Sequence, residues 1–122
     1  MILLIFLLLI CHYLCDFTPL SNSWMLKAKQ FGKPFFPILI HAFMHASFML
    51  IVLLFFIDPI LALKLAAFQW TTHFLIDVWK GRMNNWFPIL QDNTKKYYWI
   101  IFGFDQLLHQ SVILLMVNFI IF

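Results

Sequence analysis

The histidines and aspartates of this chain are spaced as if to chelate a cation. The sequence contains five of each and no glutamate. Eight of the ten form four pairs, each separated by four positions. The pairs are His12 with Asp16, His41 with His45, His73 with Asp77, and Asp105 with His109. On an α-helix this spacing puts both side chains on one face, one turn apart. Each pair therefore predicts a helix that presents two donor groups to the same point.

Imidazole and carboxylate groups are the usual protein ligands of zinc, manganese and iron. Eight such groups on four helices suffice for one or two divalent metal ions, as in the di-metal sites of soluble four-helix bundles. The abundance of histidine and the absence of glutamate favour zinc, with manganese or iron as alternatives. An aspartate that is not used as a ligand, either Asp16 or Asp77, is the candidate catalytic general base.

The pairs could also serve a purpose without metal, in two ways. Polar side chains hydrogen-bond membrane helices to one another, and a metal-free chain of ionisable groups can carry protons or ions. Ionisable groups inside a membrane are costly and usually functional. We therefore favour metal binding over both alternatives.

Glutamines and cysteines near the pairs are weaker candidates. Gln69, Gln106 and Gln110 lie close to the pairs and would either orient metal ligands or hydrogen-bond between helices. Cys11 and Cys15 lie one helical turn apart in an apolar segment, a poor arrangement for a disulfide. They are interpreted as small buried residues, with an extra soft ligand beside His12 as the alternative.

The elements that must position these groups are apolar. Hydrophobic residues make up 64% of the 122 positions and charged residues only 11%, which is too few to cover a soluble domain of this size. The few basic residues form no nucleic-acid-binding patch. The sequence predicts an all-α membrane protein, a single transmembrane domain over residues 1–122, folded as an up-down-up-down four-helix bundle. The predicted helices cover about residues 1–15, 35–57, 59–80 and 98–122.

The connections fix how the helices alternate. Asp58 and Pro59 fit a helix start, so the second and third helices form a tight hairpin. The segment 16–34 contains a short interfacial helix, and 81–97 is predicted to be an ordered loop with a polar turn. The four pairs then fall late, early, late and early in their helices. All lie in the same half of the membrane, roughly 5–15 Å below its surface.

The basic residues predict the orientation. Seven of the eight lie in or beside the two long connections: Lys27, Lys29, Lys33, Lys80, Arg82, Lys95 and Lys96. The positive-inside rule places these connections in the cytoplasm and both termini outside. Five of the seven, Lys27, Lys29, Arg82, Lys95 and Lys96, would either attract an anionic substrate or contact anionic lipid headgroups, and we favour the second.

The order of the motifs resembles that of a known family. His12-x-x-x-Asp16-Phe17, the following Trp24-Met25, His41-x-x-x-His45, His73-x-x-x-Asp77 and Asp105-Gln106-x-x-His109 are similar to the DUF3307 family of small bacterial and phage integral membrane proteins. The resemblance covers nearly the whole chain. It implies a helical membrane fold, a metal site and a location in the bacterial inner (cytoplasmic) membrane as a multi-pass protein, and it implies no reaction.

Three functions fit these observations. The first is a membrane-embedded metal-dependent hydrolase whose site lies in the cytoplasmic half of the bundle and takes an anionic or lipid-like substrate. The second is a divalent-metal transporter or channel, which the scarcity of polar residues in the outer half disfavours. The third is a structural or sensory metal site. The exposed phenylalanines leave room for a homo-oligomer without requiring one.

Overall fold

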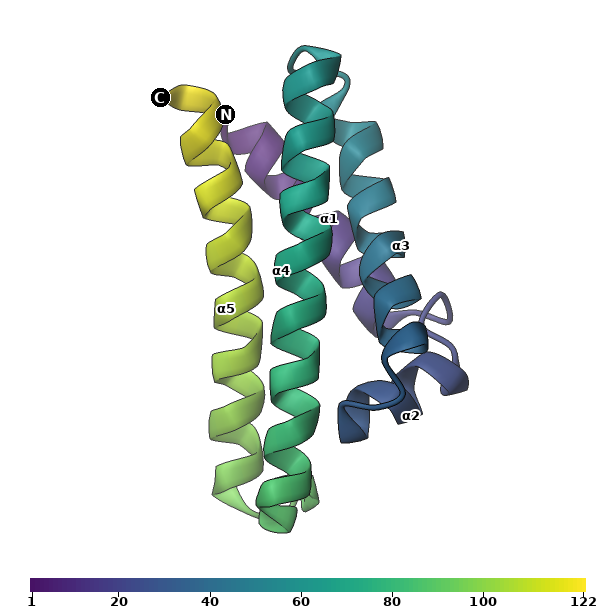
Figure 1. Ribbon diagram of the computed structural model, residues 1–122. Helices are drawn as coiled ribbons and strands as arrows, with labels where there is room; N and C mark the ends of the chain where they lie inside the picture. The colour runs from purple at the N-terminus through teal and green to yellow at the C-terminus, as the bar shows by residue number, and fades with distance from the viewer.

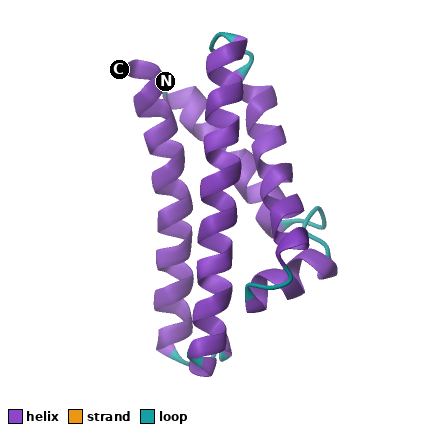
Figure 2. Ribbon diagram, in the orientation of Figure 1, coloured by secondary structure: helices purple, strands orange, loops and turns teal.

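The computed structural model describes residues 1–122 as helices joined by short loops, without strands (Figure 2). The helices are α1 (Ile2–Phe17), α2 (Ser23–Phe31), α3 (Phe35–Leu53), α4 (Pro59–Trp86), the 3-10 helix η1 (Pro88–Gln91) and α5 (Lys96–Ile121). The predicted all-α fold class is confirmed.

The four longer α-helices alternate in direction (Figure 1). Both termini and the α3–α4 turn lie at one end of the molecule, and the α4–α5 connection lies at the other. α3 and α4 pack as a hairpin, α5 packs along α4, and α1 crosses α3 and α5 obliquely. The short helix α2 packs against α3 and α4 near the end that holds the long connections. The up-down-up-down order of the four longer helices therefore matches the expectation.

Side-chain caps define two helix starts that the sequence predicted. The Asp58 carboxylate accepts hydrogen bonds from the amides of Ile60 and Leu61, both at 3.1 Å, and Pro59 occupies the first helical position. The Asn22 side chain accepts from the Met25 amide at 3.0 Å and starts α2. Each cap satisfies amide groups that the first turn of a helix leaves free.

The predicted boundaries of two helices were wrong. α3 ends at Leu53 rather than at residue 57, and α4 continues to Trp86 rather than stopping near Lys80, so residues 81–86 are helix and not loop. This last part of α4 is held by α2. Asn84 Nδ2 donates to the Gln30 carbonyl at 3.0 Å and Asn85 Nδ2 to the Phe31 carbonyl at 2.6 Å. Tertiary contacts here override the loop tendency of Gly and Asn.

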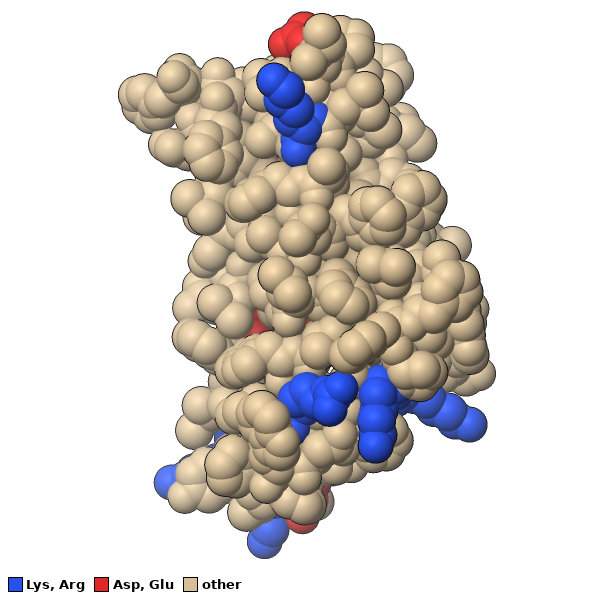
Figure 3. All heavy atoms as spheres, viewed as in Figure 1, with Lys and Arg blue, Asp and Glu red and all other residues tan.

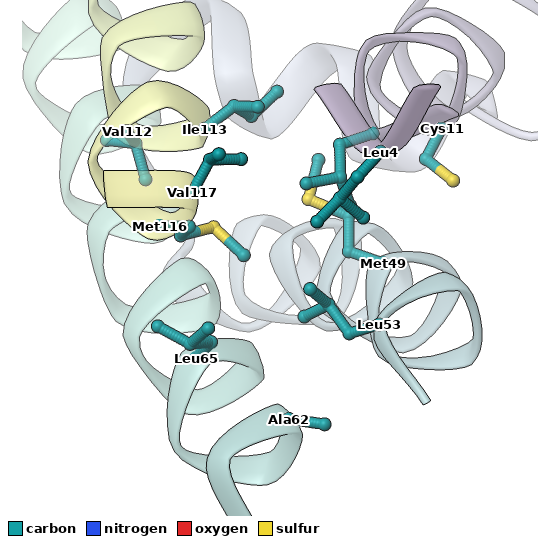
Figure 4. Packing of buried hydrophobic residues seen from close by; sticks show 11 residues of the cluster. Leu4, Cys11, Met49, Leu53, Ala62, Leu65, Val112, Ile113, Met116 and Val117 are labelled. Atoms are coloured by element: carbon teal, nitrogen blue, oxygen red, sulfur yellow. The ribbon is translucent and has the colours of Figure 1, made fainter. Parts of the chain in front are cut away.

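An apolar core fills the end of the bundle that holds the termini (Figure 4). All four longer helices contribute to it. Its members are Leu4, Leu8, Cys11, Met49, Leu53, Ala62, Leu65, Val112, Ile113, Met116 and Val117. No histidine or aspartate belongs to the core, and every His/Asp pair lies outside it. Burial of these side chains provides the packing that fixes the helices relative to one another.

The surface is also largely apolar. Figure 3 shows basic side chains gathered near one end of the molecule and one basic and one acidic side chain at the other end. In the wide band between them only a few acidic atoms are visible. α3 and α5 are long and apolar enough to cross a membrane. α1 has only 16 residues, and α4, with 28 residues, is long enough but less apolar than α3 and α5. Two candidate membrane spans are thus identified, rather than the predicted four.

Candidate metal centre

The structure brings all eight paired residues together in one buried cluster. They form three overlapping groups whose donor atoms lie within 4.8 Å of one another. The groups are Asp16 with His41, His45 and His73; His12 with His73 and His109; and Asp77 with Asp105 and His109. Because His73 and His109 each belong to two groups, the four helices contribute to one continuous set of ligands.

Asp16 is the centre of the first group. Its Oδ1 lies 2.9 Å from Nε2 of His41 and 2.9 Å from Nε2 of His45, two residues on α3. Its Oδ2 lies 3.3 Å from Nε2 of His12, one turn earlier on α1. Both partners on α3 face α1 because the spacing of four keeps them on one helix face.

Asp77 on α4, like Asp16 on α1, contacts histidines of two helices. Its Oδ2 lies 3.2 Å from Nε2 of His73, and its Oδ1 lies 3.2 Å from Nε2 of His109 on α5. His109 Nε2 is also 3.5 Å from Asp105 Oδ1. Together, Asp16 and Asp77 contact histidine side chains from all four longer helices.

The cluster is buried and incompletely hydrogen-bonded. The rings of His41, His45 and His73 are fully buried, and those of His45 and His73 pack 3.8 Å apart between centroids. Buried polar atoms normally have hydrogen-bond partners. Four possible metal-ligating atoms form no hydrogen bond, although each lies 3.2–3.5 Å from another side chain of the cluster: His73 Nε2, His109 Nε2, Asp77 Oδ2 and Asp105 Oδ1. Buried nitrogen and oxygen atoms that converge without forming hydrogen bonds fit a divalent metal ion, which would coordinate several of them at once.

The three glutamines behave differently. Gln69 is buried, and its Nε2 lies 3.4 Å from His73 Nδ1 while its Oε1 has no partner. Exchanging the amide oxygen and nitrogen lets Oε1 accept from Nδ1–H and frees Nε2 of His73 for a ligand. Gln106 Oε1 lies 3.0 Å from His12 Nε2. Gln110 is exposed, so its predicted role beside the α5 pair was wrong.

Both cysteines are buried free thiols that belong to none of the three ligand groups. Cys11 packs in the apolar core and Cys15 has no exposed surface. The interpretation as small buried residues matches the structure, whereas the soft-ligand alternative has no geometric support.

Lys29 is a member of the cluster that the sequence did not place there. Its Nζ lies 3.2 Å from both Asp16 Oδ1 and His41 Nε2, and 4.0 Å from Asp77 Oδ1. Burial alone would lower the pKa of Lys29, but the carboxylates of Asp77 and Asp16 outweigh burial and raise it. The sequence signal for this placement is the spacing of four between the apolar Met25 and Lys29, which puts both on one face of α2, and the structure buries Met25.

A cavity of about 370 Å³ opens beside the cluster. Three of the clustered carboxylates line it: Asp16, Asp77 and Asp105. Its other polar lining residues are Lys29, Lys80, Gln30, Asn84, Gln91 and Gln106, and its apolar ones are Phe17, Leu26, Leu90, Tyr98 and Phe102. A molecule that enters the cavity from the side of α2 and η1 would reach the buried cluster.

Comparison with known proteins identifies the family. The family model described as "Protein of unknown function (DUF3307)" matches residues 4–122, and the chain belongs to this family. No curated protein and no solved structure matches the chain.

Proposed function

We propose that this DUF3307 protein is an integral membrane protein that binds one or two divalent metal ions, preferably zinc, and uses them for hydrolysis. The observation that carries the proposal is the convergence of eight His and Asp side chains, from four helices, into three overlapping groups of ligand atoms. The spacing of four explains why the two residues of each pair share a helix face. It does not explain why the four faces point to one place, whereas a metal ion bound by all four helices does.

The residues suit the chemistry of such a site. A bound divalent ion would act as a Lewis acid that lowers the pKa of water and polarises a phosphoryl or acyl oxygen. Asp16 and Asp77 both line the cavity and both contact imidazoles, so either can serve as ligand or as general base. Burial of the five histidines keeps bulk water away and strengthens their interaction with a cation.

The surface of the bundle supports a membrane environment for all four longer helices. Each exposes large apolar side chains, among them Phe6 on α1, Phe43 on α3, Leu75 on α4 and Leu115 on α5. The polar residues Gln69, His73 and Asp77 lower the average hydropathy of α4 but point inward. Lys64 is exposed near the start of α4, and the exposed Thr71 donates its hydroxyl to the Ala67 carbonyl within the helix. The stretch between Lys64 and Lys80 can therefore face lipid although its mean composition is less apolar.

The charges support an orientation. α2, the end of α4 and the start of α5 carry most of the basic residues, beside the candidate centre. With that end in the cytoplasm, the metal centre lies in the cytoplasmic half and both termini face outside. α1 spans roughly 24 Å by helical rise, which is less than a bilayer core of roughly 30 Å, so it requires local thinning.

A conduit for metal ions is the less favoured function. A transporter needs a polar path from its site to both faces. Here the apolar core, with Leu8, Met49, Leu65 and Ile113 fully or almost fully buried, closes the half of the bundle opposite the cavity (Figure 4). A structural or sensory metal site would use the same ligands. Only a measurement of substrate hydrolysis distinguishes it from a hydrolase.

Elemental mass spectrometry tests the proposal. The protein would be purified in a mild detergent, without chelators and with any affinity tag removed. We expect one or two zinc, manganese or iron ions per chain, and their loss in the His41→Ala/His45→Ala double variant. Gln110→Ala is the matched control, because this residue is exposed and follows His109 directly.

The outcomes separate the candidate functions. Well-folded wild-type protein without bound metal would overturn the metal centre. Bound metal together with hydrolysis of a chromogenic phosphoester or ester, lost in the double variant, supports the hydrolase. Bound metal with no turnover and with flux into liposomes would establish the transporter instead, and metal with neither activity would leave a structural or sensory site.

A further inference from the structure

Two lysine side chains, Lys29 and Lys80, line the cavity beside the cluster. Lys29 makes all the salt bridges formed by lysine in this chain, to Asp16 and Asp77. Lys80 is half-buried, lines the cavity and forms no salt bridge within the chain. The ammonium group of Lys80 is therefore available to an anion bound in the cavity.

Amide donors complete the wall. Gln106 Nε2 donates to Asp105 Oδ2 at 3.1 Å, and Gln30 Nε2 donates to Gln91 Oε1 at 3.1 Å. A primary amide has two N–H groups, so each of these amides retains one donor for a ligand. Donors on α2, α4 and α5 thus surround the same space, an arrangement that suits an oxyanion with several oxygens rather than a single carbonyl.

We propose that the cavity binds the phosphoryl group of a phosphoester, with Lys29 and Lys80 as its binding cations and with the metal ions required for binding. This inference rests on the proposed function and names its substrate class. The apolar lining residues Phe17, Leu26 and Phe102 would contact the remainder of the ligand. The phosphoester is either a lipid headgroup or a water-soluble compound, since both present the same phosphoryl chemistry.

The charge balance of the wall makes the metal essential. Three carboxylates, Asp16, Asp77 and Asp105, and two ammonium groups, Lys29 and Lys80, give the lining a net charge of −1. One divalent ion changes this to +1 and two change it to +3. Each bound metal ion thus makes the wall more attractive to a phosphoryl anion. We therefore expect phosphate binding to depend on metal occupancy.

Inorganic phosphate is the probe for the first experiment. Its binding to the full chain is measured by isothermal titration calorimetry in a phosphorus-free detergent, with metal content determined on every sample beforehand. We expect the metal-loaded protein to bind phosphate and the metal-depleted protein to lose this binding. Lys80→Gln should weaken binding roughly ten- to hundred-fold with unchanged metal content, as expected for a charge-assisted hydrogen bond. Lys80→Arg should restore most of the affinity.

Matched variants guard against indirect effects. Lys29→Gln should weaken phosphate binding as Lys80→Gln does. Lys33→Gln removes the same charge from an exposed position outside the cavity and should leave affinity within about two-fold, because exposed charges at a distance are screened by salt. Retention of wild-type affinity in Lys80→Gln, or equal affinity with and without metal, would overturn the phosphoryl site.

The two proposals fail separately. Metal-loaded protein that binds no phosphate would end this inference and leave the metal centre in place. Protein that binds no metal would end both. The source of the phosphoester is distinguished by displacing bound phosphate with glycerol phosphate or with short-chain phosphatidic acid. Displacement by the lipid alone assigns a headgroup, and displacement by glycerol phosphate assigns a water-soluble ligand.

Discussion

Gly32 and Gly81 pack backbone against backbone and join α2 to α4. A Cβ atom on Gly81 would overlap the backbone of Gly32, and one on Gly32 would lie 2.8 Å from the Val78 carbonyl oxygen and 2.9 Å from the Arg82 amide. Gly32 also has a φ of +67°, which L side chains rarely adopt. This contact sets the position of α2, and α2 carries Lys29 into the cluster.

Gly81→Ala should therefore separate α2 from α4. We expect the free energy of unfolding to fall by about 1–3 kcal/mol, because the added methyl group forces a backbone shift. Thermal unfolding in detergent measures the effect. Gly103→Ala is the control, since a Cβ there meets no atom within 4 Å and should not destabilise. Equal stability of both variants with the wild type would show that the contact is not restrictive.

Removal of the metal should destabilise the chain. Without a cation, Asp77 Oδ2 and His109 Nε2 stay buried without a hydrogen bond. A ligand present at roughly 100 times its Kd adds about 2.7 kcal/mol to the free energy of unfolding. We expect a chelator to lower the melting temperature and added zinc to restore it. The His41→Ala/His45→Ala variant should respond to neither, and an unchanged wild-type melting curve would contradict the metal centre.

Gln69 should tune metal affinity without being a ligand. Its side-chain amide contacts His73 Nδ1 and sets which ring nitrogen of His73 is free to bind. We expect Gln69→Ala to weaken metal affinity about ten- to hundred-fold, the usual effect of losing a group that orients a metal-bound histidine. Competition with a fluorescent chelator measures this. Gln69→Glu, which retains an acceptor for Nδ1–H, should keep more affinity than Gln69→Ala.

Asp77→Asn should reduce both metal content and turnover. Asp77 contacts His73 and His109 at 3.2 Å each, and its side chain is 2% exposed. Replacing the carboxylate removes a charge that stabilises the buried cation. Asp92→Asn is the control, because Asp92 is exposed in the α4–α5 connection and accepts from Thr94. Metal content and chromogenic substrate turnover, measured together, separate loss of the ion from loss of a base.

The membrane orientation is tested by cysteine labelling. Cys11 and Cys15 would be replaced by alanine, and single cysteines introduced by Lys95→Cys and Phe122→Cys; Phe122 is 95% exposed. In intact cells a membrane-impermeant maleimide should label position 122 and not position 95. In inverted vesicles we expect the reverse. Labelling of both positions from the same side would overturn the proposed up-down-up-down crossing of the membrane.

Local sequence was sufficient to predict much of the site. A spacing of four puts two side chains on one helix face whatever the rest of the chain does, so the pairs from His12–Asp16 to Asp105–His109 could be identified from position alone. The start of α4 was predictable for the same reason, because Asp58 caps amides only two and three residues away. Resemblance to the family rested on the same pairs in their order.

Tertiary structure determined the contacts between residues that are far apart in the sequence, which helical spacing does not predict. Lys29 meets His41 and Asp77 only because α2 folds back onto α4 through Gly32 and Gly81, a contact between residues 49 positions apart in the sequence. The extension of α4 to Trp86 depends on the same docking, which supplies partners for Asn84 and Asn85. The sequence by itself determined the faces of the helices and their caps, since these depend on nearest neighbours. Only packing between helices determined which cations share the cavity.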